Sequence, residues 1–579
     1  MGKRPDKKLS NSKKNLLLSL GLNGAILSAV LIFTDMTYES GDDYAIAKYL
    51  ADGYPYSGFV SYYLSKVLIA IQAHVSQLNV YVLFLIAISF VSFVYISVLV
   101  LNRSRSLPVC MMLTAILMVF SFDHYCAIQF TKAAGLVTTA GFIGLVDSAT
   151  LKRKPAGYIF PFFLIYTGAA IRYGTYPAML GMAAAAIGMW MLIDCKEWKP
   201  EGWLSPKSLI SAAVILVLLF GVFGTIKLSQ IKNTSTPELK LYDEYNLVRS
   251  NVIDYPTFVY YEEKKAEYDA IGISENDMFL IDNWRLDYDG AASLENLKKI
   301  DSIERPKDPL PQRAKSSIKK TLRTVLNGMR DRNSTGIHII VLSLAALAMI
   351  AALRPKRWLY VIAVGGVAFA LYAYLYFVQR AIYRVVYLAD IGAALWLLYY
   401  FAYYEDRKPD EIRKKAAAIC CAVLLAISLY FTPELAANCA SKYSKLESKV
   451  MSEAVVKYYE DNRDKALVWG TGQRKRPERY IKPWLVPDDT DRNGFGTGGW
   501  DVMSPYSLDC LAEYGLHNPI KDLIDNDSAY YIGNEYVEQL EQYYNDWYAG
   551  DGETIKMTQI ETIDDLSVWK VVKVPDDSV

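Results

Sequence analysis

The sequence predicts a polytopic α-helical membrane protein with about eleven transmembrane helices, its N-terminus inside and its C-terminus outside. Three observations predict this class. Apolar runs long enough to cross a bilayer fill the chain from Leu16 to about Tyr400, and a last one ends near Phe431. Basic residues cluster at alternate ends of these runs. Two polar stretches, Lys227–Thr335 and Ser441–Val579, are long enough to fold outside the bilayer.

The first apolar run, Leu16–Phe33, follows a strongly basic N-terminal segment, which contains Lys3, Arg4, Lys7, Lys8, Lys13 and Lys14. Basic residues next to a membrane helix are retained in the cytoplasm, so we predict that the N-terminus stays inside. No small-residue cleavage pattern follows the run, which favours a retained helix over a removed signal peptide. The net charge of +1 gives no indication of a nucleic-acid partner.

The stretch Gly58–Gln77 is only half apolar, and its pattern favours a helix that lies in the membrane interface. Counting it as a crossing would invert every later loop and place the basic clusters outside, so we exclude that reading. Ten further crossings are then predicted: Val80–Leu101, Leu107–Phe120, Ala133–Asp147, Gly157–Ala170, Pro177–Ile193, Leu209–Ile226, Ile337–Leu353, Leu359–Phe377, Val385–Tyr404 and Ala416–Phe431.

We expect four regions: an N-terminal transmembrane module (1–226), a helical outer insertion (227–335), a second transmembrane module (336–432) and an outer α/β domain (433–579). The last region begins with a charged stretch that predicts a helix, Ser441–Arg463. Alternating strand and helix patterns follow it, which is typical of a small α/β domain. The expected strands are Ala466–Trp469, Ala529–Ile532, Ile555–Ile560 and Ser567–Val574, and the expected helices are Pro505–Tyr514 and Asn534–Tyr544. The glycine-rich stretch Gly494–Asp501 lacks the setting of a nucleotide loop and is read as a plain loop.

Cysteine and histidine spacing does not by itself indicate a metal site. Most of the seven cysteines lie in apolar runs, and only Cys439 and Cys510 fall in the C-terminal outer region, where the two could pair. The chain has no CxxC or HExxH pattern, and its four histidines are too far apart in sequence to indicate a site.

The most informative polar stretch is Glu39-Ser-Gly-Asp42-Asp43, directly after the first membrane helix. Two adjacent carboxylates at a membrane interface resist full ionisation, so such a pair commonly binds a metal, accepts a proton or holds a polar ligand. A simpler interpretation remains open, in which Asp42 or Asp43 caps a helix over Tyr44–Leu50.

The other predicted outer loops add acids early in the chain and basic residues later: Asp123, His124, Lys132, Arg172, Arg380 and Arg384. Such a set suits a reaction in which an acid activates a hydroxyl while arginines hold a phosphate leaving group. Arg380 and Arg384 are four residues apart, so they could share a helix face and bind an anion, or pair with Asp390 or lipid headgroups. Arg172 could simply anchor a helix end, and His124 could be a hydrogen-bonding loop residue.

These features resemble membrane glycosyltransferases of the GT-C type, which use lipid-phosphate-linked sugars. The resemblance covers the acid pair after the first helix, the interfacial stretch Gly58–Gln77 and the outer C-terminal region. It implies that Asp42 or Asp43 is the catalytic base, and that Lys132, Arg172, Arg380 and Arg384 contact the donor phosphate. Asp123, with Glu39 and His124, would match a second acidic site, where a divalent metal such as Mg or Mn could bind through Asp43 and Asp123. Segments such as Gly272–Asp277 and Trp284 also resemble uncharacterised bacterial cell-surface polysaccharide membrane proteins.

The expected activity is therefore transfer of a sugar from a polyprenyl-phosphate donor to a cell-envelope glycan, lipid or protein on the outer face of the cell membrane. Two alternatives remain open. A polysaccharide polymerase or ligase would also keep arginines for a lipid diphosphate, but would not need the early acid pair. The other alternative is a transporter or an assembly protein without catalytic activity. A transporter would need charged residues near the membrane midplane.

Overall fold

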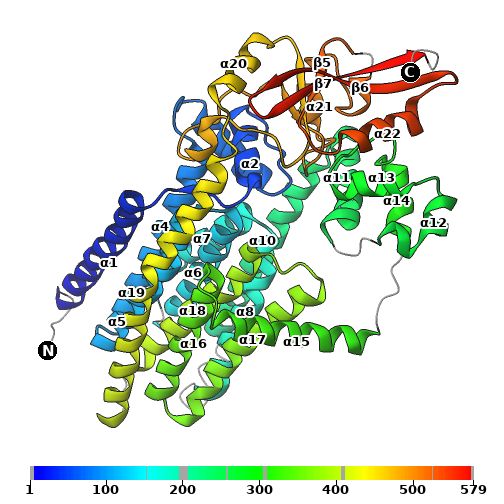
Figure 1. The fold of residues 1–579 in the computed structure, drawn as a ribbon. Helices are drawn as coiled ribbons and strands as arrows, with labels where there is room; N and C mark the ends of the chain where they lie inside the picture. The colour runs from blue at the N-terminus through cyan, green and yellow to red at the C-terminus, as the bar shows by residue number, and fades with distance from the viewer. Residues whose placement is uncertain are drawn as a thin grey trace. The chain divides into compact units, whose positions relative to one another are not determined.

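The computed structural model describes residues 6–151, 153–194, 206–255, 259–303, 309–405, 411–524 and 526–575. The chain forms two compact units (Figure 1). Unit 1 contains Met1–Gln230, Leu310–Ser444 and Lys482–Val486, and unit 2 contains Ile231–Pro309, Lys445–Ile481 and Pro487–Val579. Lys3 and Arg4, on which part of the predicted orientation rests, lie outside the described residues.

Unit 1 is a bundle of long apolar helices, which confirms a multi-pass helical membrane protein. Ten of its described helices are long and apolar enough to cross a bilayer. They are α1 (Asp6–Phe33), α4 (Val80–Arg103), α5 (Leu107–Cys126), α6 (Phe130–Thr150), α8 (Thr175–Asp194), α10 (Pro206–Asn233), α16 (Ser334–Ala352), α17 (Trp358–Phe377), α18 (Tyr383–Glu405) and α19 (Glu411–Glu447). The short turn η3 (Pro355–Arg357) precedes α17. Helices α6 and α18 are the central ones, because their spans are 89% and 94% buried, against 17% for α1.

Helix α7 (Ala156–Ile171) is shorter, at 16 residues, but it packs antiparallel along most of α6. Gly168 lies against the Ala134 carbonyl at one end, and Gly141 lies against the Pro161 carbonyl near the middle. At the other end the Ser148 hydroxyl donates to the Gly157 carbonyl at 2.9 Å. A Cβ at position 168 would come within 2.8 Å of that Ala134 oxygen, so glycine allows the two backbones to approach closely.

One end of the bundle of unit 1, here called the site end, is joined by short polar elements. Strands β1 (Thr37–Tyr38) and β2 (Ala127–Ile128) pair in parallel, which ties the chain after α1 to the chain after α5. Helix α2 (Gly41–Ala51) follows β1, and the 11-residue α3 (Tyr62–Gln72) is too short to cross a bilayer. At the start of α4, the Asn79 amide donates to the Tyr38 hydroxyl at 2.9 Å.

The opposite end of the bundle has its own polar cluster. Arg103, the last residue of α4, donates through Nε to the Asp147 carboxylate at 2.9 Å, and the Tyr399 hydroxyl donates to the same carboxylate at 3.0 Å. These residues lie near the C-terminal ends of α4, α6 and α18, so the three helices run in the same direction.

The structure corrects two predicted helix ends. Helix α5 continues to Cys126, so Asp123 and His124 lie in its last turn and not in a loop. Their polarity suggested a helix end, but buried partners hold both side chains within the bundle. The last crossing is longer than predicted, because α19 runs unbroken for 37 residues through Pro433. The predicted helix Ser441–Arg463 is therefore wrong: its first residues belong to α19, and a separate α20 (Glu453–Asp461) begins after the capping residue Ser452.

Unit 2 combines residues from both polar stretches around a five-stranded sheet of order β4-β3-β5-β7-β6. The four predicted strands are confirmed as β3 (Ala466–Trp469), β5 (Ala529–Ile532), β6 (Glu553–Ile563) and β7 (Leu566–Pro575). Strand β3 is parallel to its neighbours β4 and β5, whereas β7 is antiparallel to β5 and β6. β4 (Gly494–Gly496) was missed because it lies in the glycine-rich stretch, and glycine is a weak strand former.

The described part of the insertion that belongs to unit 2 is mostly helical, as predicted. Its helices are α11 (Pro237–Arg249), η1 (Ser250–Asp254), η2 (Tyr261–Glu263), α12 (Lys265–Ala270), α13 (Glu275–Asp282) and α14 (Leu294–Ser302). The C-terminal region contributes α20, η4 (Glu478–Ile481), α21 (Pro505–Ala512), η5 (Lys521–Leu523) and α22 (Val537–Tyr548). Asp287 joins the insertion to the C-terminal region, because its carboxylate accepts hydrogen bonds from Asn518, Tyr543 and Tyr548.

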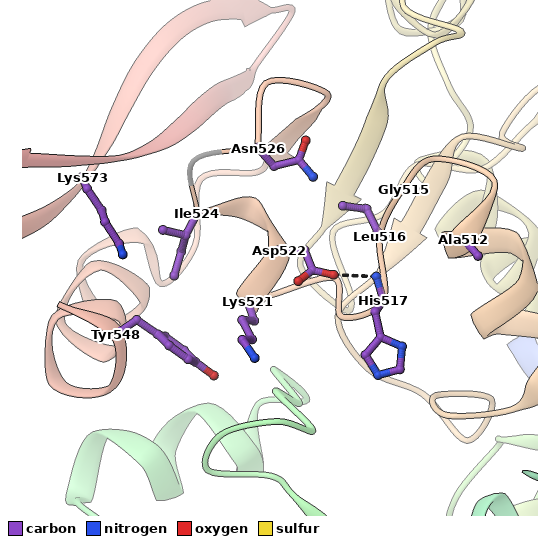
Figure 2. Close-up of a pocket in the computed structure, with 10 residues that line it drawn as sticks. All are labelled: Ala512, Gly515, Leu516, His517, Lys521, Asp522, Ile524, Asn526, Tyr548 and Lys573. Atoms are coloured by element: carbon purple, nitrogen blue, oxygen red, sulfur yellow. Dashed lines mark hydrogen bonds between the residues drawn. The ribbon is translucent and has the colours of Figure 1, made fainter. Parts of the chain in front are cut away.

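Unit 2 also carries an open pocket of about 660 Å³ between η5, α22 and the end of β7 (Figure 2). Its charged side chains already have partners. Lys521 pairs with Asp289 at 3.5 Å and Lys573 with Glu553 at 3.8 Å, while Asp522 accepts from the backbone N–H groups of His517 and Asn518. The pocket therefore has no free acid–base pair among its described residues.

Candidate functional site

The two predicted acids lie in the first turn of α2, at the site end of unit 1. The N-cap of this helix is Ser40, so the alternative in which Asp42 or Asp43 is the cap is wrong. Both carboxylates still lie close to the positive end of the helix dipole, which favours their negative charge. The chain folds this way because β1 pairs with β2 immediately before α2 begins.

Asp43 is fully buried and held by three donors. Its Oδ1 accepts hydrogen bonds from the Tyr81 hydroxyl and from the backbone N–H of Phe130, each at 3.0 Å. The Ser40 hydroxyl approaches Oδ2 at 3.4 Å. Burial, followed by the negative charge of Asp42, raises the pKa of the Asp43 carboxyl to about 8. Asp43 is therefore mostly protonated at neutral pH.

Asp42 differs from its neighbour because its side chain reaches the surface. It is 23% exposed and forms an ion pair with Arg384, which is 24% exposed, at 3.0 Å. An accessible carboxylate beside an accessible guanidinium can exchange partners when another anion arrives. Of the two acids, Asp42 is the one that a bound molecule could reach.

Two more arginines lie close to this pair. Arg172 ends α7, and its guanidinium lies over the rings of Phe59 and Phe130, at 5.1 and 4.9 Å from their centroids. Burial lowers the pKa of Arg172, and the charges of Arg384, Asp42 and Arg380 are close enough to act on it as well. Repulsion among three guanidinium groups is relieved by bound anions, so the cluster suits a phosphate.

The expectation that Arg380 and Arg384 share a helix face is wrong. Arg380 lies in the turn between α17 and α18, where its N–H donates to the Leu375 carbonyl at 2.8 Å. Arg384 lies in the first turn of α18. Asp390, proposed as their partner, instead accepts from the Tyr372 hydroxyl at 2.8 Å.

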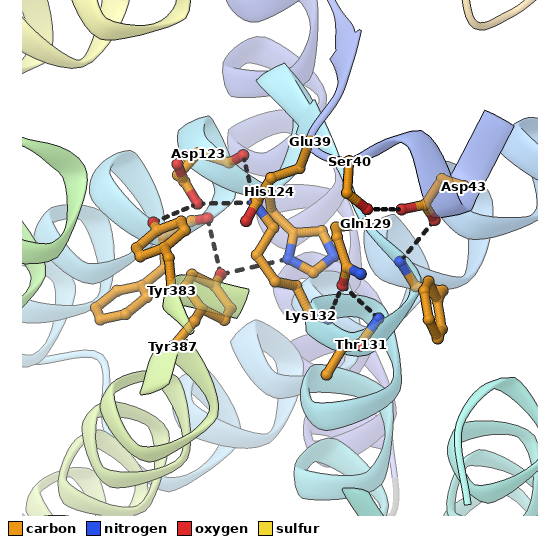
Figure 3. A network of polar contacts seen from close by, with 12 residues as sticks. Glu39, Ser40, Asp43, Asp123, His124, Gln129, Thr131, Lys132, Tyr383 and Tyr387 are labelled. Carbon is orange, nitrogen blue, oxygen red and sulfur yellow. Dashed lines mark hydrogen bonds and ion pairs between the residues drawn. The ribbon is translucent and has the colours of Figure 1, made fainter. Parts of the chain in front are cut away.

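Lys132, at the start of α6, is fully buried in a second polar network (Figure 3). Its ammonium group pairs with Glu39 at 2.6 Å and with Asp123 at 3.0 Å. The Tyr383 hydroxyl donates to the same Asp123 oxygen at 2.9 Å, and Lys442 lies over the Tyr383 ring at 5.3 Å. These contacts connect the chain after α1 with α5, α6, α18 and α19.

His124 is buried beside this network with both ring nitrogens engaged. Nε2 lies 2.8 Å from the Ser89 hydroxyl and Nδ1 lies 3.3 Å from the Tyr387 hydroxyl. The interpretation of His124 as a hydrogen-bonding residue therefore fits, although it lies in a helix and not in a loop.

The acids at which a divalent metal was expected are engaged with other partners. Lys132 already supplies a positive charge between Glu39 and Asp123, and one oxygen of Asp43 accepts from two hydrogen-bond donors. Within the described residues, no three His, Cys, Asp or Glu side chains are grouped closely enough to hold a metal.

Sequence reasoning missed Tyr81, Tyr383 and Lys442. The two tyrosines lie in the first turns of α4 and α18, and the general tendency of tyrosine to occur at membrane interfaces does not distinguish individual residues. Tyr383 is adjacent to Arg384 in sequence, which could have indicated it. Lys442 lies in the part of α19 that was predicted as a separate helix, and no sequence signal marked it.

Comparison of the chain with models of protein families, with curated proteins and with solved structures finds no match.

Proposed function

We propose that the chain is a membrane glycosyltransferase of the GT-C type, which transfers a sugar from a polyprenyl-phosphate donor to a cell-envelope acceptor on the outer face of the membrane. The observation that carries this proposal is the ion pair between Asp42 and Arg384, with Arg172 and Arg380 close by. It places an accessible acid beside a cluster of cations that suits a phosphate.

Binding of the donor phosphate would prepare the base. The Arg384 guanidinium would exchange its ion pair with Asp42 for one with the lipid phosphate. The Asp42 carboxylate would then be able to accept a proton. Asp42 then takes the proton of the acceptor hydroxyl while the hydroxyl oxygen attacks the anomeric carbon. The bond between that carbon and the phosphate oxygen breaks, and the phosphate leaves with the electron pair, stabilised by Arg172, Arg380 and Arg384. The proton is later released from Asp42 to water.

Asp43 would act as a positioning residue. Because its pKa is raised to about 8, it is mostly neutral near pH 7 and does not repel the charge of Asp42. Its hydrogen bonds to Tyr81 and Phe130 fix the first turn of α2 against α4 and α6. The Lys132 network would support the same end of the bundle.

The test is sugar transfer by the full chain in proteoliposomes that contain a series of radiolabelled undecaprenyl-phosphate sugars and a cell-envelope fraction as acceptor. We expect Asp42→Asn to lower the rate by about 10²- to 10⁴-fold, the usual contribution of a general base. The matched control is Asp35→Asn, the same chemical change at an exposed residue seven positions earlier.

Unchanged transfer by Asp42→Asn would exclude Asp42 as the base and would overturn the proposal. If transfer then fell only in Arg384→Ala, the arginines would serve a reaction without a base, as in a polymerase or ligase that acts on a polyprenyl-diphosphate-linked glycan.

A further inference from the structure

Helix α15 (Leu310–Gly328) belongs to unit 1 but is not one of its candidate membrane spans. Its sequence has no Asp or Glu, and five of its residues are basic: Arg313, Lys315, Lys319, Lys320 and Arg323. A helix with one charge sign and a separate apolar face is typical of segments that lie on a membrane surface.

One face of α15 packs against the bundle. The Ser317 hydroxyl donates to the Ala373 carbonyl, and the Thr324 and Tyr376 hydroxyls lie 2.6 Å apart. The Arg313 guanidinium lies over the Phe377 ring, 4.4 Å from its centroid. These contacts place α15 against the last turns of α17, a candidate membrane span.

A second face is apolar and uncovered within unit 1. Ile318, Leu322 and Leu326 recur every four residues and are 47%, 50% and 61% exposed. Four-residue spacing puts these side chains in one row along the helix. Lys315, Lys319 and Arg323 form a parallel row, because each is one turn from the next. The apolar row therefore lies between the packed face and a basic face.

Helix α15 lies at the site end of the bundle. It leads by a short turn into the N-terminus of α16, where the His338 ring lies 3.4 Å from the Tyr383 hydroxyl of the buried network. Its other neighbour, α17, ends at Phe377, just before Arg380. The helix is thus close to the level at which the bundle changes from apolar to polar.

We propose that α15 binds the surface of an anionic phospholipid bilayer. It would lie in the plane of the interface, with Ile318, Leu322 and Leu326 among the acyl chains and the basic row at the phosphate headgroups. Charge complementarity favours this occupant over a protein partner, as does direct packing on a membrane-spanning helix. The proposal does not depend on the proposed function, since it requires only that unit 1 is embedded in a membrane.

The test is hydrogen–deuterium exchange of the full chain in nanodiscs with one chain per disc, which excludes a second copy as the occupant. One set of discs contains phosphatidylcholine only, and the other contains an equal mixture with phosphatidylglycerol. We expect the amides of 310–328 to exchange at least about fivefold more slowly in the anionic discs. Peptides from α14 should show no lipid dependence.

Two triple variants test the cause. Lys315→Gln with Lys319→Gln and Arg323→Gln should remove the lipid dependence. The control Lys265→Gln with Lys298→Gln and Lys299→Gln makes the same charge change on α12 and α14 and should behave as the natural chain does. Equal exchange of α15 in both lipids would overturn the proposal. Lipid dependence that persists in the first triple variant would also overturn it, because the basic row would then not be the contact.

Discussion

Asp42 and Asp43 are adjacent in the chain, yet their surroundings assign them different tasks. Asp42 is partly exposed and paired with Arg384, whereas Asp43 is fully buried and held by Tyr81 and Phe130. Two carboxylates this close cannot both ionise easily, and the buried one keeps its proton. The sequence predicted that the pair has a function, but it left open which residue is the base, because burial decides this and burial depends on contacts with α4 and α6.

The raised pKa of Asp43 predicts a pH-dependent stability. Its pKa is 3.8 in the unfolded chain and about 8 in the folded one. Between these values the folded state binds one more proton, so stability falls as pH rises, by about 1.4 kcal/mol per pH unit, and stays level above pH 8. Asp43→Asn mimics the neutral acid and should remove this slope.

The measurement is the thermal midpoint in detergent from pH 5 to pH 9. The gap between Asp43→Asn and the natural chain should widen as pH rises, in favour of the variant. Parallel curves for the two proteins would show that Asp43 is not the residue that titrates. Asp35→Asn, at an exposed site, should leave the curve of the natural chain unchanged.

Lys132 gives a second prediction at the residue scale. Lys132→Met leaves Glu39 and Asp123 without their cation in a buried network, which should destabilise the chain by about 3–5 kcal/mol. The triple change Lys132→Met, Glu39→Gln and Asp123→Asn removes all three charges and should recover most of that loss. The stability of both variants is measured as the midpoint of thermal unfolding in detergent. A single variant as stable as the natural chain would mean that the network does not hold the bundle together.

At the scale of elements, apolar length predicted the membrane helices, and short strand patterns predicted four strands of the sheet. These signals are local, because each depends only on the residues of one short segment. The misplaced ends have a non-local cause. α5 extends to Cys126 because Lys132, Tyr383 and Ser89, on other helices, satisfy Asp123 and His124. Nothing within α5 itself could show this.

The junction of α5 and α19 provides a prediction at this scale. The thiols of Cys126 and Cys439 lie close enough to interact, whereas from the sequence alone Cys439 and Cys510 could have paired. A mild oxidant such as copper phenanthroline, which accepts the two electrons, should join Cys126 and Cys439 in a disulfide within one chain. Mass spectrometry of the unreduced digest identifies the bond. Cys126→Ser should abolish it, and the absence of a Cys126–Cys439 bond after oxidation of the natural chain would contradict the arrangement.

At the scale of the whole unit, the sequence predicted the members of the candidate site better than their arrangement. The lengths of the apolar runs and the charged residues at their ends indicated Asp42, Arg172 and Arg384, because charged residues beside membrane helices stand out in an apolar sequence. The split into a partly exposed ion pair of Asp42 with Arg384 and a buried group around Lys132 was not predictable, since it depends on which helix ends meet. Lys132 illustrates this. We expected its side chain to bind a phosphate, whereas in the structure it pairs with the carboxylates of Glu39 and Asp123.

Whether the C-terminus lies on the same side of the membrane as the N-terminus depends on α7. The ten long spans alone are an even number and would return the chain to the side on which it began, whereas counting α7 makes eleven crossings. At 16 residues α7 is about 24 Å long, somewhat less than a typical hydrocarbon core of about 30 Å. It nevertheless packs along α6 from Ser148 to Ala134, so we expect it to cross where α6 does.

This predicts that the two termini lie on opposite sides of the membrane, with the C-terminus and the site outside. The measurement uses intact spheroplasts of cells that produce the chain with one epitope tag at each end, treated with a protease that cannot enter. The C-terminal tag should be removed, and the N-terminal tag should be lost only after lysis. If both tags resist or both are removed, α7 does not cross, and Asp42 and Arg172 cannot then meet at one membrane face as the ion-pair geometry requires. If only the N-terminal tag is removed, the arginines face the cytoplasm and the proposed outer-face transfer is wrong.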